Sequence, residues 1–349
     1  MSKCDLYLVF DKDDRTYYPG DEVLGAARVV VNKDVRCEKI FLRTEWRTHG
    51  KGNSASGARE EIVIAEGASL YAGQEQTIPF RFTVPDGPLT YHGKYLNVDW
   101  YARLQVDVPW AIDPKHDEDF LVIENPADAG RTLVMGDAEL VARQEGVANN
   151  LVRSKKMQGG VLSLFGLLFF LPGLACAIAS FFLNEGLGDR VGMFVIGSIF
   201  SLIGGIIVFC GLRNKIARKK IGEVQLDVVP MDLARGQEIS VNIRCSPSDS
   251  GVIDNMSSVL TCEEVVVEGS GTKRTTYTCT VCEDMQERAP MALSGVRQGV
   301  AESFTHVIPK TAPATFLADD NKVCWQVVVR ISIKGWPDWV ETRDIVVRY

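Results

Sequence analysis

The sequence predicts a mainly β protein: two tandem immunoglobulin-like β-sandwiches with a two-helix transmembrane hairpin between them. Three observations support this fold class. Short apolar segments separated by turn formers fill residues 1–125 and again residues 222–349. Two long uncharged segments, 160–183 and 191–212, lie between these parts. The two strand-rich parts also share the order and spacing of several motifs, which indicates an internal repeat.

Residues 1–125 are expected to form the first sandwich. Apolar segments such as Val29–Val31 and Ile40–Leu42 have the length of strands, and Leu104, Val106 and Val108 alternate with polar residues. Turn-forming residues separate these segments, for example at Gly50–Gly57. Many short strands with such turns are typical of a sandwich or a barrel.

Residues 126–156 are expected to be a linker that contains an amphipathic juxtamembrane helix. Leu140, Val141, Val147 and Leu151 recur at a nearly helical spacing. The linker leads into the helical hairpin, which we assign to residues 157–213.

The two uncharged segments are each long enough to cross a hydrocarbon core of about 30 Å as a helix. The loop between them is short, so the second helix must return antiparallel to the first. Gly197, Ser201 and Gly205 are small residues four apart, a spacing that lets another helix approach closely. We therefore assign them to helix packing. The partner helix belongs either to the same hairpin or to another copy of the chain in a homo-oligomer.

Basic residues flank the hairpin on both sides, whereas the connecting loop has only one, Arg190, beside two acids. This asymmetry predicts a two-pass integral membrane protein with both termini in the cytoplasm. The same flanking residues are candidates for binding anionic lipid headgroups, although a role in topology alone explains them equally well. They are Arg153, Lys155, Lys156, Arg213, Lys215, Arg218, Lys219 and Lys220.

The formal net charge is −7, and the basic residues are concentrated at the hairpin. The remaining parts are therefore more acidic than the average, which argues against nucleic acid as a partner. The amino terminus has no basic start followed by an apolar stretch, so no secretory signal is expected. Two of the nine cysteines lie in the uncharged segments, and those in cytoplasmic domains are expected to be reduced thiols.

The repeat is clearest around two tryptophans. In the first part, Phe80 precedes Pro85 by five residues, and Trp100 opens an alternating strand. In the second part, Phe304 precedes Pro309 by the same interval, and Trp325 opens the corresponding strand. A turn at Pro19–Val23 also matches one at Arg235–Ile239. The shared order favours a true repeat over chance similarity between two β domains.

These motifs resemble the arrestin family. The resemblance rests on the opening turn Pro19–Val23, the strand Ile78–Pro85 and the residues that follow it, Pro88, Tyr91 and Gly93. It covers residues 5–125 well and 222–347 more weakly. The resemblance implies a tandem of sandwiches that acts as a non-enzymatic adaptor for membrane proteins. The chain departs from the family by the inserted hairpin, by the lack of a tail and by the lack of a Pro-Pro-x-Tyr motif.

No residues are predicted to be catalytic, cofactor-binding or metal-binding. Cys279 and Cys282 have a spacing seen in redox and metal sites, but their neighbours predict a strand, in which they would face opposite sides. The acidic segment Asp113–Asp119 could bind a cation, yet a charged loop between strands explains it as well. The four histidines are far apart in the sequence.

Trp336, Trp339 and Trp110 are candidate partner-binding residues. The first two form a Trp-Pro-Asp-Trp segment, and Trp110 follows Pro109 at the matching place in the first part. Tryptophans in such turns can anchor a partner or enter a membrane interface. Closing the end of a sandwich is the alternative role.

The leading hypothesis is a membrane-anchored, non-catalytic adaptor that presents two cytoplasmic sandwiches to an unidentified membrane or membrane-proximal protein. The alternative is an accessory subunit of a membrane transport or envelope complex, assembled through the hairpin. An enzyme that uses Cys279 and Cys282 is a third, weaker hypothesis.

Overall fold

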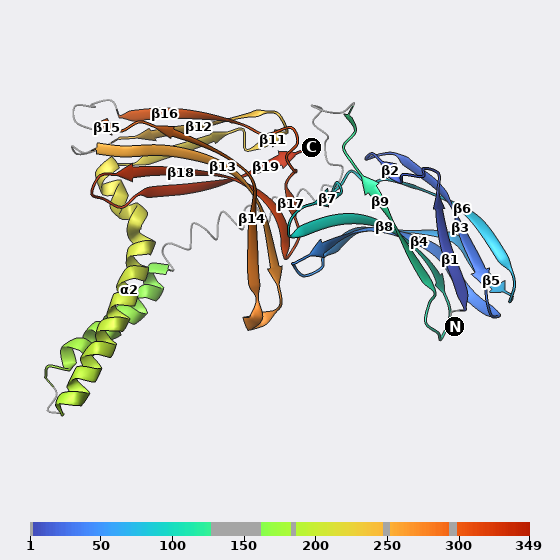
Figure 1. Ribbon diagram of the computed structural model, residues 1–349, viewed down its shortest axis with the longest axis horizontal. Helices are drawn as coiled ribbons and strands as arrows, with labels where there is room; N and C mark the ends of the chain where they lie inside the picture. The colour runs from blue at the N-terminus through green and yellow to red at the C-terminus, as the bar shows by residue number, and fades with distance from the viewer. Residues whose placement is uncertain (1–2, 127–161, 183–185, 247–251, 293–298) are drawn as a thin grey trace.

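The computed structural model describes residues 3–126, 162–182, 186–246, 252–292 and 299–349 (Figure 1). The predicted fold class is confirmed. The chain is mainly β, and its four sheets form two sandwich-like halves. Two long apolar helices lie between these halves in the sequence. The proposed juxtamembrane helix and the basic residues Arg153, Lys155 and Lys156 lie outside the described residues.

The N-terminal sandwich consists of a three-stranded and a six-stranded sheet. The smaller sheet has the order β1 (Cys4–Phe10), β3 (Glu22–Val31) and β6 (Glu75–Thr83). The larger sheet has the order β2 (Thr16–Tyr17), β9 (Lys115–Val122), β8 (Leu96–Asp107), β4 (Val35–Gly50) and β5 (Ser56–Leu70), and β7 (Tyr91–His92) pairs with β8.

The C-terminal sandwich repeats this arrangement. Its smaller sheet has the order β10 (Val224–Val229), β12 (Glu238–Cys245) and β16 (Val300–Val307). Its larger sheet has the order β11 (Asp232–Ala234), β19 (Trp339–Arg348), β18 (Asn321–Ile333), β13 (Val252–Glu268) and β14 (Thr275–Arg288). Two short strands complete it: β15 (Met291–Ala292) pairs with β13, and β17 (Phe316–Leu317) pairs with β18.

The predicted repeat is therefore present in the topology. Each half has a three-stranded sheet of the same order, and each larger sheet contains one parallel pair, β2 with β9 and β11 with β19. The remaining strand pairs are antiparallel in both halves. Only β15 has no counterpart among the described strands of the N-terminal half.

The repeat extends to individual hydrogen bonds. Trp100 Nε1 donates to the carbonyl of Pro88 at 2.7 Å, and Trp325 Nε1 donates to the carbonyl of Pro313 at 2.9 Å. Both indoles are buried, so each needs such an acceptor. Each tryptophan thus holds the loop that precedes its own strand, and the two loops are equivalent in the repeat.

The turns that open each half are equivalent as well. Gly20 and Gly236 both have a positive φ, near +80°, which glycine adopts without strain. The Gly20 N–H donates to the carbonyl of Val84 at 2.9 Å, and the Gly236 N–H donates to that of Ile308 at 2.8 Å. Each turn leads into the middle strand of its three-stranded sheet, and its glycine bonds the residue that follows the third strand.

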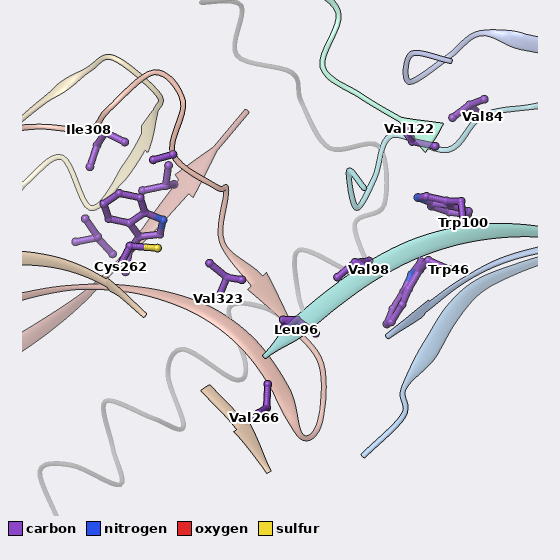
Figure 2. Packing of buried hydrophobic residues seen from close by; sticks show 14 of the residues in the cluster. Trp46, Val84, Leu96, Val98, Trp100, Val122, Cys262, Val266, Ile308 and Val323 are labelled. Atoms are coloured by element: carbon purple, nitrogen blue, oxygen red, sulfur yellow. The ribbon is translucent and has the colours of Figure 1, made fainter. Parts of the chain in front are cut away.

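The apolar core is continuous between the two halves. Leu96 and Val98 of β8 belong to the same buried cluster as Val266 of β13 and Val323 of β18 (Figure 2). Inward residues alternate with outward residues along both long strands, β8 and β18. The two sandwiches therefore pack against each other, a point that the sequence left open.

The first apolar helix spans Leu162–Ala179, and the second, α2, spans Leu187–Ile221. Both are mostly exposed and are long and apolar enough to cross a membrane. The second helix continues beyond the predicted end at residue 212. Its last turns pack on the C-terminal sandwich, where Ala217 and Ile221 are fully buried. This burial stabilises helical turns that are too polar to lie in a bilayer.

Candidate functional site

The junction between the sandwiches is built around the loop that joins β4 to β5. The Asn53 side-chain amide donates to the Gly269 carbonyl at 2.9 Å and to Asp320 Oδ2 at 2.7 Å. Its side-chain carbonyl accepts from the Gly269 N–H at 3.0 Å, and its backbone N–H donates to the Val267 carbonyl at 2.8 Å. One asparagine thus connects the loop to two segments of the C-terminal sandwich.

A second asparagine, Asn321, reaches back from the C-terminal half. It is buried, and its amide donates to the Asn53 carbonyl at 2.5 Å and to Thr48 Oγ1 at 3.2 Å. Gly52 packs directly against Asn321, and a Cβ at this position would collide with the Asn321 side chain. The glycine is therefore required by the close approach of the loop.

Glu264 of β13 forms the other half of the junction. Its carboxylate is only 1% exposed and accepts three hydrogen bonds from the N-terminal half. The donors are Tyr91 Oη at 2.6 Å, the Lys94 N–H at 3.0 Å and the Tyr95 N–H at 2.7 Å. Burial and the bond to Glu264 raise the pKa of Tyr91. A buried carboxylate with these donors is compensated, and it fixes the position of the 91–95 turn.

Gly93, in the turn of residues 91–95, allows Glu264 to approach closely, because a Cβ at this position would overlap the Glu264 carboxylate. A cavity of about 500 Å³ lies beside this contact, with Glu264, Cys279 and Arg235 among its lining residues. Arg235 forms an ion pair with Glu124 at 2.7 Å, again between the two halves. The junction therefore adds these polar contacts and an open cavity to the apolar packing between the halves.

Tyr349 packs into the same junction. It lines a cavity of about 200 Å³ together with Leu89, Arg235 and Phe316. Burial of the hydroxyl raises the pKa of Tyr349 to about 12. The residue after the last strand thus contacts the N-terminal half.

A serine, a histidine and an aspartate meet between the two sheets of the C-terminal half. Ser258 Oγ lies 2.8 Å from His306 Nε2, and His306 Nδ1 lies 2.6 Å from Asp284 Oδ2. This is the connectivity of a nucleophile, a base and an orienting acid. However, Ser258 and His306 are both 0% exposed, so no substrate reaches the hydroxyl. We interpret the group as a polar bridge between the sheets.

Cys279 and Cys282 lie on the same face of β14, contrary to the expectation from strand geometry. The reason is a β-bulge: Cys262 pairs with Cys282, whereas the next residue of β13, Glu263, pairs with Thr280. Cys282 is hydrogen-bonded to Cys262, and this contact together with burial raises the pKa of the Cys262 thiol. Among the described residues, no group of His, Cys, Asp or Glu has the arrangement of a metal site.

Carboxylates of the acidic segment Asp113–Asp119 form hydrogen bonds and ion pairs within the protein. Asp113 accepts from the Val108 N–H at 2.9 Å, and Asp117 accepts from Arg103 and Arg47. The bonds from Arg103, and then those from Arg47, lower the pKa of Asp117 to about 2. These partners favour the structural role of the segment.

The end of α2 is fixed to the edge of the C-terminal sandwich. The Asn214 amide donates to the Val340 carbonyl at 2.6 Å, and its side-chain carbonyl accepts from the Val340 N–H at 3.2 Å. Arg218 lies 3.9 Å from Glu341. The other basic residues of this turn, Arg213, Lys215 and Lys219, are exposed, and Lys220 is partly buried.

The three candidate tryptophans lie in different environments. Trp339 is fully buried within the sandwich, where it cannot contact a partner. Trp336 is 40% exposed, and the Lys220 ammonium lies 5.8 Å from its ring centre. Trp110, in the β8–β9 loop, is 105% exposed.

The small residues of α2 face the first helix. Gly197 packs against Gly173 and Ala177, and a Cβ added to Gly197 would lie 2.6 Å from the Ala177 nitrogen. The next close contact is at Gly204, which packs on Phe170. Gly205 lies beside this contact, where an added Cβ would be 3.6 Å from the Phe170 ring. Ser201 is close to Gly173 on the same face.

Sequence reasoning missed Asn53, Glu264 and Asn214. A sequence clue exists for Glu264, because alternation along β13 places it on the inward face with Cys262 and Val266. A charged residue at an inward position needs a buried partner. The other two residues are polar positions in a loop and a helix, and nothing in their local pattern distinguishes them.

No family model and no curated protein matches this chain. Among solved structures, the chain is similar to Spo0M, a sporulation control protein from Bacillus subtilis, at 22% sequence identity and a TM-score of 0.31. The likeness covers 36% of this chain and 51% of the Spo0M chain, about half of its length. A likeness of this size identifies neither a family nor a function.

Proposed function

We propose that the protein is a membrane-anchored, non-catalytic adaptor whose two sandwiches form one rigid binding platform. The observation that carries this proposal is the direct continuation of α2 into the C-terminal sandwich through Asn214, Ala217 and Ile221. An apolar helix attached in this way holds the sandwich close to the bilayer. Tethering raises the effective concentration of the platform for partners in the same membrane.

The contact between the sandwiches supports a hairpin rather than a single crossing. The Asn53 and Glu264 contacts require both halves to lie on the same side of the membrane. Two antiparallel crossings satisfy this requirement. The exposed basic residues after the second crossing favour the cytoplasmic side.

The adaptor role is supported by the free strand edges and by the resemblance to arrestins. Strands β5 and β14 are the outer strands of the two larger sheets, and each can receive an extended peptide from a partner. The non-catalytic role is supported by the burial of Ser258 and His306, which keeps the hydroxyl and the imidazole of this triad-like group away from solvent.

The anchor is tested by labelling single cysteines introduced at Ser56, Gly186 and Ser270 in intact cells. The accessible native cysteines would be replaced by serine, and the reagent would be a membrane-impermeant maleimide. We expect labelling at position 186 alone. Labelling at only one of positions 56 and 270 would contradict the hairpin, and labelling at both but not at 186 would reverse the orientation.

The adaptor role is tested by a photoreactive residue at Thr278, an exposed position of β14. We expect discrete crosslinked species in native membranes. The matched control is the same probe at Arg330, which is exposed on the central strand β18. Equal crosslinking at the two positions would argue against binding at the strand edge.

The alternative, an accessory subunit assembled through the hairpin, is favoured by one feature. A groove of about 630 Å³ runs between the two apolar helices and is lined by Ser198, Ser201 and Gly205 among larger apolar residues. Such a groove can receive a third helix. Replacing the hairpin with an unrelated one separates the two functions, because only the adaptor should keep its partner.

A further inference from the structure

One end of the N-terminal sandwich collects exposed aromatic and basic side chains. Strand register places three loops at this end: the β3–β4 loop after Val31, the β5–β6 loop after Leu70 and the β8–β9 loop after Asp107. The opposite ends of β4 and β8 carry the junction with the C-terminal sandwich. We call the three loops, together with Lys3 before β1, the distal tip.

Three large side chains of the distal tip have little contact with the protein. Trp110 is 105% exposed, Ile112 is 94% exposed and Tyr71 is 64% exposed. Solvent exposure of apolar surface is unfavourable. A cluster of such residues in one place is typical of an interaction surface.

The β8–β9 loop holds Trp110 and Ile112 outward in a defined conformation. Trp110 has φ near +60°, which is rare for a bulky residue. The Ala111 N–H donates to the Val108 carbonyl at 3.3 Å, and Asp113 caps the loop by accepting from the Val108 N–H at 2.9 Å. The turn is thus fixed by its own hydrogen bonds while its tryptophan points away from the core.

The distal tip and the residues that flank it carry three lysines together with Asp34, Asp107 and Asp113, so they have no net charge. Lys33 and Lys115 are exposed there, and Lys3 is half-buried. Asp34 and Asp113, two acids of these loops, each accept a hydrogen bond from a backbone N–H. Tryptophan and tyrosine with lysine are the residues enriched where proteins meet lipid headgroups.

The distal tip also lies on the side of the molecule from which the apolar hairpin extends. In Figure 1 the β8–β9 loop and the hairpin both point downwards from their sandwiches, and the hairpin reaches lower. The connection between them is rigid at both joints: α2 is fixed to β19 through Asn214, and the sandwiches are fixed through Asn53 and Glu264. The direction of the tip is therefore set by the anchor.

We propose that the distal tip is a second, peripheral membrane contact, in which Trp110, Ile112 and Tyr71 enter the headgroup region of the same bilayer that the hairpin crosses. This inference rests on the proposed membrane anchor. It gives the N-terminal sandwich its own attachment to lipid, independent of the basic end of α2.

The test uses tryptophan fluorescence of the full chain in vesicles of phosphatidylcholine and phosphatidylserine. Four of the six tryptophans are buried in the sandwiches, so Trp110 and Trp336 are the exposed ones. Trp336→Phe removes the second of these. The difference between Trp336→Phe and the double variant Trp336→Phe/Trp110→Phe then isolates the emission of Trp110.

We expect the Trp110 emission to be lost when the lipid acyl chains carry bromine, a short-range quencher, and to persist in unbrominated vesicles. Equal emission in both bilayers would overturn the proposal. A blue-shifted but unquenched Trp110 would also overturn it, because the residue would then be buried against protein. Flotation of the same samples separates the two claims. A chain that does not float contradicts the anchor itself, whereas a floating chain with unquenched Trp110 contradicts only the tip contact.

Discussion

At the scale of single residues, Asp117 of β9 shows how a charged segment is stabilised. Its carboxylate accepts from Arg103 Nε at 2.6 Å and from Arg47 Nη1 at 2.7 Å, and it is mostly shielded from solvent. Both arginines are themselves partly buried, and Arg47 also pairs with Glu45 at 2.8 Å, so Arg103 depends most on the charge of Asp117. The pKa of Asp117, lowered to about 2 chiefly by Arg103, reflects this arrangement.

Asp117→Asn is expected to lower the free energy of unfolding by about 1–3 kcal/mol at neutral pH, because the partly buried Arg103 loses its counter-charge, whereas Arg47 keeps Glu45 at 2.8 Å. The folded pKa lies below the ordinary value of 3.8, so this contribution is complete above about pH 5 and is lost as the pH falls through about 2. Urea unfolding of both proteins across this range measures the difference. Asp119→Asn, with a side chain that is 69% exposed, is the matched control. A difference that does not change with pH would contradict the assignment.

At the scale of elements, the two apolar helices approach each other through backbone contacts at glycine. Gly197 and Gly204 are the buried glycines of α2, seven residues apart, and each touches the backbone of the first helix. Helices in lipid associate by such close packing, since burial from water does not drive them together.

Gly204→Ala is expected to separate the helices or destabilise the hairpin, by about 1–3 kcal/mol, because the added Cβ would overlap the backbone at Phe170. Gly205→Ala, one residue further, should be nearly neutral, since its Cβ would make an ordinary contact with the Phe170 ring. Thermal unfolding in detergent micelles compares the two variants. Equal effects of the two substitutions would show that the helices do not pack as described.

The sequence could predict features that depend on local pattern. Alternation and turns predicted the two sandwiches, uncharged length predicted the two helices, and motif spacing predicted the repeat around Trp100 and Trp325. The bulge of β14 could not be predicted, because it depends on how β13 pairs with it, and it reversed the expected facing of Cys279 and Cys282. The burial of Trp339 likewise depends on the pairing of β18 with β19, which places it opposite the buried Ile331.

The junction residues show the same limit over longer distances. Glu264 meets Tyr91 and Tyr95 across about half of the chain length, and no periodicity connects these positions. The sequence singled out the turn at Tyr91–Gly93 through family resemblance, but it could not name the carboxylate that the turn surrounds. Such contacts arise only when both halves have folded.

At the scale of the whole molecule, Glu264 decides whether the two sandwiches act as one body. Glu264→Gln would place an amide N–H₂ opposite a donor from the 91–95 turn, which leaves one buried donor unpaired. The junction should weaken by about 1–3 kcal/mol. Hydrogen exchange at the Lys94 and Tyr95 amides is expected to become faster.

Glu263→Gln is the control for this variant, because Glu263 lies on the other face of the same strand, where it accepts from Gln326. Exchange at Lys94 and Tyr95 should be unchanged in the control. Protection of these amides that is equal in both variants would mean that Glu264 does not hold the junction.

The attachment of α2 at one end of the C-terminal sandwich also gives the molecule the mechanics of a lever. The pivot lies where α2 meets β19, and the N-terminal sandwich is the far end of the arm (Figure 1). A transmembrane hairpin adjusts its tilt to the thickness of the bilayer. If the hairpin crosses a bilayer as proposed, any such tilt is magnified at the N-terminal sandwich, and bilayer thickness then sets how deeply the distal tip reaches into the headgroup region.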